Sequence, residues 1–133
     1  SQQPIQDYKG TEKILVVDDI KEQREIAKQF LEKLGYQVDM AGSGEDAIEY
    51  MKNRKADLLL LDMIMDPGID GLETYEKILA IHRDQKAIIV SGYSESDRVK
   101  GALDLGAGAD VKKPYILHAI ARAVREELDK KIQ

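Results

Sequence analysis

Residues 58–62 read Leu58-Leu59-Leu60-Leu61-Asp62, four leucines that lead directly into an aspartate. Such a short, unbroken apolar run, followed by turn residues over 66–71, predicts a strand that is buried on both faces. Asp62 then stands where that strand leaves the core. In an open parallel sheet, ligands bind in the crevice at the carboxyl ends of the strands, so Asp62 is a candidate functional residue. A lone aspartate also serves as a polar strand terminator, and the choice depends on which other side chains reach the same edge.

The composition indicates one ordinary domain without disulfides. Its 133 residues contain 20 Lys and Arg against 25 Asp and Glu, a formal net charge of −5, and no cysteine. A negative chain is unsuited to nucleic acid or to an anionic membrane surface, because both carry negative charge themselves. The absence of cysteine excludes disulfides, thiol catalysis and cysteine-ligated metals, and it fits a reducing compartment.

The sequence shows neither a candidate membrane span nor a secretion signal. Its apolar runs are strand-sized, well short of the ~20 residues that cross a bilayer, and the N-terminus lacks a charged stretch followed by an apolar one. We therefore expect a soluble, cytoplasmic protein without membrane insertion. Residues 1–10 are polar and aperiodic, which predicts a linker or a cloning remnant, and residues 11–133 are expected to form the domain.

Hydrophobic periodicity divides the domain into alternating strands and helices. Short apolar and β-branched runs predict strands at 14–17, 36–40, 58–61, 87–90 and 109–111. Apolar positions at helical spacing predict amphipathic helices that cover 20–34, 43–51, 72–79, 99–103 and 117–128. Gly35 is expected to end the first helix, and Ser43 to cap the second through its hydroxyl. For the fourth helix, the candidate caps are Ser94 and Ser96.

Five strands that alternate with five helices predict a doubly wound α/β fold. Parallel strands need crossover connections, and right-handed crossovers place helices on both faces of the sheet. We expect a five-stranded parallel sheet in the flavodoxin-like (βα)5 order 2-1-3-4-5. The continuously apolar first strand belongs in the centre of this sheet, and the more polar second strand lies nearer to an edge.

Polar side chains follow four of the predicted strands: Asp18 and Asp19 the first, Asp62 the third, Ser91 the fourth and Lys113 the fifth. In the 2-1-3-4-5 order those strands are consecutive neighbours, so three carboxylates, a hydroxyl and an ammonium converge on one crevice. Clustered carboxylates oppose folding unless a cation neutralises them, and an oxygen-only set suits Mg²⁺. With an ammonium nearby, such a site can hold a phosphoryl group beside a nucleophilic carboxylate.

Six short motifs occur in this order along the chain: Val16-Val17-Asp18-Asp19, Leu61-Asp62, Asp70-Gly71, Ser91-Gly92, Gly106-Ala107 and Lys113-Pro114. Together they resemble the receiver domain of two-component response regulators, and the resemblance extends from about Lys13 to about Lys130. It implies a Mg²⁺-dependent domain that accepts a phosphoryl group from a histidine kinase phosphohistidine and switches conformation to signal. Such a domain assists its own phosphorylation and dephosphorylation but turns over no external substrate as a dedicated enzyme.

The resemblance implies which residues bind the phosphoryl group and the metal. It makes Asp62 the phosphoacceptor. It makes Asp18, Asp19 and Asp62 the carboxylate ligands of Mg²⁺, completed by the backbone carbonyl of Ile64. One of the two adjacent aspartates is also suited to cap the following helix.

The resemblance also assigns the hydroxyl and the ammonium of the crevice. Ser91 stands at the family's switch position, where the hydroxyl moves toward the phosphoryl oxygen. Lys113 matches the family's lysine, and its bond to Pro114 is expected to be cis. Lys112, the neighbouring lysine, is assigned to solvent.

Two positions depart from the family pattern. Asp66 is an extra residue in the loop after the third strand, where it adds negative charge beside the site. Asp110 occupies the position of the family's aromatic switch residue, so the usual coupling between hydroxyl and ring cannot operate. Two alternatives stay open: signalling runs through Tyr93, Tyr115 or the nearby helix, or the switch is weakened.

Residues 65–68 and 112–115 are most similar to receivers attached to sensor histidine kinases. The resemblance therefore implies a histidine kinase as phosphodonor, either separate or in the same parent chain. A downstream protein is expected to bind the face of the fourth and fifth helices, and a homodimer stays open. His82 and His118 lie in charged helical stretches, so we expect both to be solvated rather than to act as phosphodonors.

Three other functions fit the residues less well. A flavin- or nucleotide-binding domain of this fold needs a hydroxyl- or glycine-rich phosphate cradle after the first strand, where this chain has Asp18-Asp19. A phosphatase with an aspartate nucleophile usually has a second Asp two residues later, where this chain has Ile64. The serious rival is a receiver-shaped interaction module that no longer switches, as Asp66 and Asp110 suggest. The intact charged cluster argues against it, because a purely structural domain gains nothing from so costly a set.

Overall fold

The computed structural model describes residues 3–92 and 96–132. The strands in these ranges are β1 (Lys13–Val17), β2 (Gln37–Ala41), β3 (Leu58–Asp62), β4 (Ala87–Ser91) and β5 (Asp110–Lys112). The helices are the 3-10 helix η1 (Ile5–Tyr8) and the α helices α1 (Lys21–Lys33), α2 (Gly44–Asn53), α3 (Gly71–Ile81), α4 (Ser96–Asp104) and α5 (Leu117–Asp129). Each predicted strand and α helix is therefore present, with shifts of a few residues at the ends.

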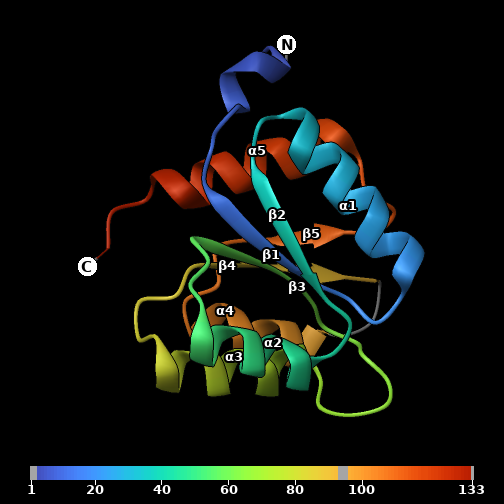
Figure 1. Ribbon diagram of the computed structural model, residues 1–133, viewed down its shortest axis with the longest axis vertical. Coiled ribbons are helices and arrows are strands. Elements are labelled where there is room, and N and C mark those ends of the chain that lie inside the picture. The colour runs from blue at the N-terminus through green and yellow to red at the C-terminus, as the bar shows by residue number, and fades with distance from the viewer. Residues whose placement is uncertain (1–2, 93–95, 133) are drawn as a thin grey trace.

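The strands form one parallel sheet in the order β2-β1-β3-β4-β5, as predicted. Helices α1 and α5 cover one face of this sheet, and α2, α3 and α4 cover the other (Figure 1). The polar strand β2 lies at one edge and the short β5 at the other, whereas β1, β3 and β4 occupy the centre. This is the doubly wound flavodoxin-like architecture, with right-handed crossovers as its usual connection.

The core consists of two apolar layers that share the same three strands. Leu59 and Leu61 face α2, α3 and α4, whereas Leu58 and Leu60 face α1 and α5. All four leucines have no exposed surface. Because alternate residues of a strand point to opposite faces, a strand covered on both sides must be apolar at every position. The unbroken leucine run is the sequence signature of that double cover.

The predicted ends of the first two helices are confirmed. Gly35 has a φ of +100°, and its N–H donates to the carbonyl of Glu32 at 2.9 Å, which closes the last turn of α1. Ser43 Oγ accepts from the N–H of Asp46 at 3.0 Å and caps α2. Ser94 and the side chain of Ser96, the candidate caps of α4, lie outside the described part of the structure.

The N-terminal segment differs from the predicted linker, because its described residues 3–10 pack onto the domain. Tyr8 is only 6% exposed, its backbone carbonyl accepts from Tyr36 OH at 2.8 Å, and its ring meets His118 edge to face with centroids 5.2 Å apart. His118 Nε2 also lies 2.7 Å from the carbonyl oxygen of Gln3. A single buried ring produces no hydrophobic periodicity in a sequence, which is why the pattern of residues 1–10 predicts a linker.

The prediction that both histidines are solvated is also wrong. His82 is half-buried, and its Nε2 lies 2.8 Å from the carbonyl oxygen of Met51. Both rings therefore contact backbone carbonyls of segments distant in sequence.

Among the described residues, no helix is long and apolar enough to cross a membrane.

Arg125 of α5 connects the N-terminal segment to the domain. Its guanidinium forms a bidentate ion pair with Glu12, at 2.6 and 3.1 Å, and lies 2.8 Å from Asp129 Oδ1. It also donates to the hydroxyl of Tyr36 and to the carbonyl of Lys9, both at 3.2 Å. The hydrogen bond from Arg125 holds the pKa of Glu12 below its usual range. One side chain thus holds the entry to β1, the start of β2 and the end of α5.

We expect Arg125→Ala to lower the free energy of unfolding by about 1–3 kcal/mol, because several charge-assisted hydrogen bonds are lost together. Urea unfolding followed by circular dichroism measures the change. The matched control is Arg122→Ala, which removes an exposed pair with Glu126 on the same helix and should change stability by less than about 0.5 kcal/mol. Equal effects of the two substitutions would contradict a structural role for the Arg125 network.

Candidate functional site

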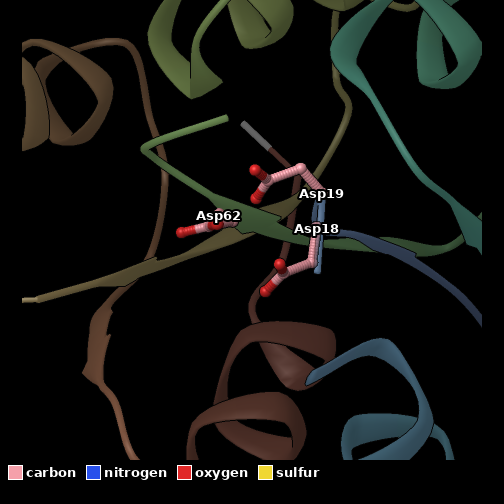
Figure 2. Close-up of side chains that lie close together, drawn as sticks. All are labelled: Asp18, Asp19 and Asp62. Carbon is pink, nitrogen blue, oxygen red and sulfur yellow. The ribbon is translucent and has the colours of Figure 1, made fainter. Parts of the chain in front are cut away.

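Three carboxylates meet at the carboxyl ends of β1 and β3. Asp18 and Asp19 follow β1, and Asp62 is the last residue of β3 (Figure 2). One carboxylate oxygen from each lies within 4.8 Å of the other two. Asp18 has no exposed surface and Asp62 is only 5% exposed, so two of these charges are withdrawn from water. The structure therefore brings the three predicted aspartates together.

Backbone contacts orient Asp18. Its N–H donates to the carbonyl of Ala41 on β2 at 3.2 Å, and its own carbonyl accepts from Arg24 Nη1 at 2.8 Å. Its Oδ1 accepts from the N–H of Ile20 at 2.9 Å. The predicted helix cap is therefore wrong: Ile20 is the N-cap of α1, without a side-chain bond, and Asp18 binds that residue's amide from the preceding turn.

Lys113 supplies the cation of the site. Its Nζ lies 3.0 Å from Asp18 Oδ2 and 3.3 Å from Asp62 Oδ2. Its N–H donates to the carbonyl of Ser91 at 3.1 Å, which holds the residue at the end of the sheet. The bond from Lys113 to Pro114 is cis, as predicted. Lys113, rather than its neighbour Lys112, is therefore the lysine that reaches the candidate phosphoacceptor.

The electrostatic balance of the site is set by burial and by excess negative charge. Burial, and then the charge of Asp18, raise the pKa of Asp62 from 3.8 to about 6, although Lys113 acts in the opposite direction. Burial lowers the pKa of Lys113, but the hydrogen bond to Asp18 and the charges of Asp62 and Asp18 outweigh it and raise the pKa overall. One ammonium therefore does not neutralise the cluster.

The donor set fits a hard divalent cation. Asp18 Oδ2 is buried, and its ion-pair partner Lys113 Nζ, at 3.0 Å, is shared with Asp62. Two buried carboxylates that share one ammonium keep uncompensated negative charge, which is costly, and an additional cation would neutralise it. Carboxylate oxygens are the ligands that Mg²⁺ prefers. Ile64 follows β3 by two residues at the same edge, and the role of its carbonyl stays a prediction.

The hydroxyl of Ser91 is bonded to two residues of β5. Ser91 is 1% exposed, and its Oγ donates to Asp110 Oδ1 at 2.5 Å. Lys112 Nζ donates to Ser91 Oγ at 3.0 Å and to Asp110 Oδ2 at 2.7 Å. The assignment of Lys112 to solvent therefore holds only in part. Its side chain is 58% exposed, but its ammonium is bound by Ser91 and Asp110.

The loop with the extra residue is held by polar contacts from both sides. The N–H of Asp66 lies 3.3 Å from Asp19 Oδ2, so the insertion gives the site an amide donor as well as an exposed charge. Glu45 of α2 accepts from the N–H of Ile69 at 3.1 Å. Gly68, with a φ of +108°, lies against the Glu45 carboxylate, and a Cβ there would come within 2.7 Å of it.

Sequence reasoning missed three contacts of the site. Arg98 of α4 binds the carboxylate of Asp70, the N-cap of α3, through two hydrogen bonds of 2.8 Å. Glu45 holds the loop after β3, and Asp110 binds Ser91. Of these contacts only that of Asp110 has a related sequence signal: Asp110 and Lys112 are two residues apart on a predicted strand, so their side chains share a face.

The two tyrosines considered as alternative signalling residues lie in different situations. Tyr115 is half-buried on the side of α1 and α5, and burial, with the charges of Asp18 and Asp62, raises its pKa. Its hydroxyl therefore stays protonated near neutral pH. Tyr93 lies outside the described residues.

The family profile of the response regulator receiver domain matches residues 14–125, so the chain belongs to this family. Sporulation initiation phosphotransferase F of Bacillus subtilis is 35% identical over 117 residues, which are 88% of this chain and 94% of that protein. The CheY-like receiver domain protein of Methanospirillum hungatei JF-1 has a similar crystal structure, with a TM-score of 0.83 and 30% identity over 90% of this chain and 95% of that one. The chain is therefore a receiver domain of the two-component response regulators.

Other relatives are longer. The transcriptional regulatory protein CpxR of Escherichia coli K12 is 38% identical over 103 residues, which are 77% of this chain but 43% of that protein. The response regulator MprA of Mycobacterium sp. strain KMS is matched over 49% of its length. The chain thus spans nearly all of one relative and about half of the others.

The raised pKa of Asp62 predicts a pH-dependent stability. Because the folded-state pKa of about 6 exceeds the ordinary value of 3.8, ionisation of Asp62 costs stability as the pH rises through 6. We expect Asp62→Asn to be more stable than the wild type by about 1–3 kcal/mol at pH 8 without divalent cations, since one pKa unit is worth about 1.4 kcal/mol. The difference should vanish below about pH 4, where Asp62 is protonated in both states.

Urea unfolding in EDTA between pH 4 and pH 8 measures this dependence. Asp104→Asn, at an exposed position of α4, is the matched control and should show no such trend. If the difference in the free energy of unfolding between Asp62→Asn and the wild type stays constant across this range, the raised pKa of Asp62 in the folded state is contradicted.

Proposed function

We propose that Asp62 accepts a phosphoryl group from a histidine kinase phosphohistidine in a Mg²⁺-dependent reaction, and that the domain changes conformation in response. The observation that carries the proposal is the contact of one lysine with two buried carboxylates, those of Asp62 and Asp18, so that a single ammonium faces more negative charge than it can neutralise. A receiver that served only as a scaffold would gain nothing from this uncompensated charge.

Each side chain of the cluster has a part in the proposed transfer. An oxygen of Asp62 forms the bond to phosphorus while the bond from phosphorus to the donor imidazole nitrogen breaks. Lys113 Nζ, already 3.3 Å from Asp62 Oδ2, is placed to donate to the incoming phosphoryl oxygens. Ser91 donates its hydroxyl to the same group once it is free to do so.

Asp18, Asp19, Asp62 and the carbonyl of Ile64 would hold the Mg²⁺. The ion would supply positive charge to balance the carboxylates and the phosphoryl oxygens. Asp18 is already oriented for this role, because its Oδ1 is held by the N–H of Ile20 and its Oδ2 faces the crevice beside Lys113. The donor set carries no nitrogen or sulfur ligand, which favours Mg²⁺ over softer metals.

The partners follow from the same proposal. Receiver domains interact with histidine kinases, and we propose that the donor kinase is either a separate cytoplasmic protein or part of the same parent chain. A similar structure is the N-terminal domain of a response regulator/sensory box/GGDEF 3-domain protein from Carboxydothermus hydrogenoformans, with 29% identity and a TM-score of 0.81. A downstream protein would bind the surface at the β5 edge of the sheet, which α4 and α5 flank from opposite faces, and this chain would act on no other substrate as an enzyme.

Intact mass after incubation with acetyl phosphate and Mg²⁺ tests the phosphoacceptor. We expect one phosphoryl group to be added to the wild type and to Asp66→Asn, which alters an exposed carboxylate next to the site. Asp62→Asn, and the wild type in EDTA, should gain none. A folded, Mg²⁺-binding wild type that gains no mass would favour a receiver-shaped interaction module instead.

Lys113→Ala tests the cation of the site. Removal of a preorganised charge from a buried anionic centre costs about 10²-fold in rate, so we expect phosphoryl uptake from acetyl phosphate to slow by that order. Lys100→Ala, at an exposed position of α4, should leave the rate unchanged. Uptake by Lys113→Ala at the wild-type rate would remove Lys113 from the proposed mechanism.

A further inference from the structure

Ser91, Asp110 and Lys112 form a closed polar triangle at the ends of β4 and β5. Ser91 Oγ donates to Asp110 Oδ1 at 2.5 Å and accepts from Lys112 Nζ at 3.0 Å. Lys112 Nζ closes the triangle on Asp110 Oδ2 at 2.7 Å and also reaches the carbonyl of Gly92 at 3.3 Å. Every pair in the triangle is therefore bonded.

The strand register places this triangle on the strands next to the candidate phosphoacceptor, at the same end of the sheet. Ser91 is paired with Lys112 on β5, and Asp62 on β3 is paired with Val90, the residue before Ser91. Asp110 lies opposite Ile89, whose side chain faces α2, α3 and α4. Because alternate residues share a face, the triangle stands on the side of the sheet that α4 covers.

The Ser91 hydroxyl can donate to only one acceptor at a time. A serine carries one proton that it can donate, and here that proton is committed to the Asp110 carboxylate. Ser91 is 1% exposed and the Asp110 side chain 18%, so water competes little for this charge-assisted bond. Ser91 cannot donate to Asp110 and to a phosphoryl oxygen on Asp62 at the same time.

We propose that Asp110 is a positioning residue that sequesters the hydroxyl proton of Ser91, so that binding of a phosphoryl group at Asp62 must first break the Ser91–Asp110 bond. The inference rests on the proposed function of Asp62. We call the Ser91–Asp110 hydrogen bond the latch. Lys112 supports the latch, because its ammonium binds both residues and neutralises the Asp110 carboxylate, which would otherwise repel the phosphoryl group. When Ser91 turns away, its bonds to Asp110 and Lys112 are both released, and the ion pair of Asp110 and Lys112 remains.

The latch acts against the phosphorylated form of the domain. A phosphoryl group must compete with a carboxylate for Ser91, and its binding is weakened by the equilibrium constant of the latch. A shorter side chain at position 110 removes that competition, and a neutral acceptor of the same shape weakens it. Asp110 would therefore set the threshold at which Ser91 engages, in place of an aromatic residue.

Binding of the beryllium trifluoride anion, a noncovalent mimic of a phosphoryl group, tests the latch in the presence of Mg²⁺. We expect Asp110→Ala to bind it about tenfold more tightly than the wild type, which corresponds to the loss of one competing hydrogen bond. Asp110→Asn preserves the shape and keeps a neutral acceptor, so its gain should be smaller and informs the test if the alanine variant fails to fold. Asp104→Ala, which removes an exposed carboxylate of α4, should bind as the wild type does.

The Ser91→Ala background separates the latch from simple charge repulsion. If Asp110 acts through Ser91, the tenfold gain of Asp110→Ala should disappear when the hydroxyl is absent. A gain that persists in this background would assign the effect to repulsion and overturn the latch. Mg²⁺-dependent binding by the wild type with no gain in Asp110→Ala would overturn the latch alone. Absence of Mg²⁺-dependent binding in every variant would overturn the proposed function together with this inference.

Discussion

The site depends on one half-buried lysine whose ammonium faces two buried carboxylates. Lys113 Nζ lies 3.0 Å from Asp18 Oδ2 and 3.3 Å from Asp62 Oδ2, and both carboxylates are buried, so water solvates neither of them well. Burial, and then the charge of Asp18 with a smaller effect of Asp19, raise the pKa of Asp62 to about 6. The excess negative charge lowers the stability of the fold, and it also favours the binding of an additional cation in the crevice. Stability and function are therefore opposed at these residues.

The sheet continues past its formal ends to build a frame beneath the site. The N–H of Asp18 donates to Ala41 on β2, that of Met63 to Val90 on β4, and that of Lys113 to Ser91 on β4. Each functional strand end is thus held by a neighbour. Because the strands are parallel and buried on both faces, all these ends reach the same edge. A small rotation of one strand would move several charges together, which the double apolar cover prevents.

The two departures from the family pattern are compensated by local contacts. The extra Asp66 leaves its carboxylate exposed while its amide approaches Asp19, and Glu45 holds the far side of the loop. The carboxylate of Asp110 is balanced by Lys112, two residues later on the same strand. The added charge of Asp110 thus has a bonded partner in the folded state, whereas that of Asp66 faces solvent. Neither departure disturbs the contact of Lys113 with Asp62.

The N-terminal segment shows where local patterns lose information. Its polar residues have no period, yet Tyr8 is buried against α5 and Tyr36, and Arg125 of α5 binds the chain just before β1. The contacts with α5 join residues separated by more than a hundred positions. Only the folded chain brings these positions together, so their identities alone could not have shown the packing.

The sequence by itself determined the fold class, the strand order and the residues of the crevice. Double burial demands continuous apolar strands such as 58–61, helices repeat near 3.6 residues, and the polar residue that ends each strand must lie at one edge. The tertiary structure alone decided which partner each polar group takes. Ser91 bonds to Asp110, Arg98 to Asp70 and Glu45 to the loop after β3. Such choices depend on register and rotamer, which long-range packing sets and a local pattern does not encode.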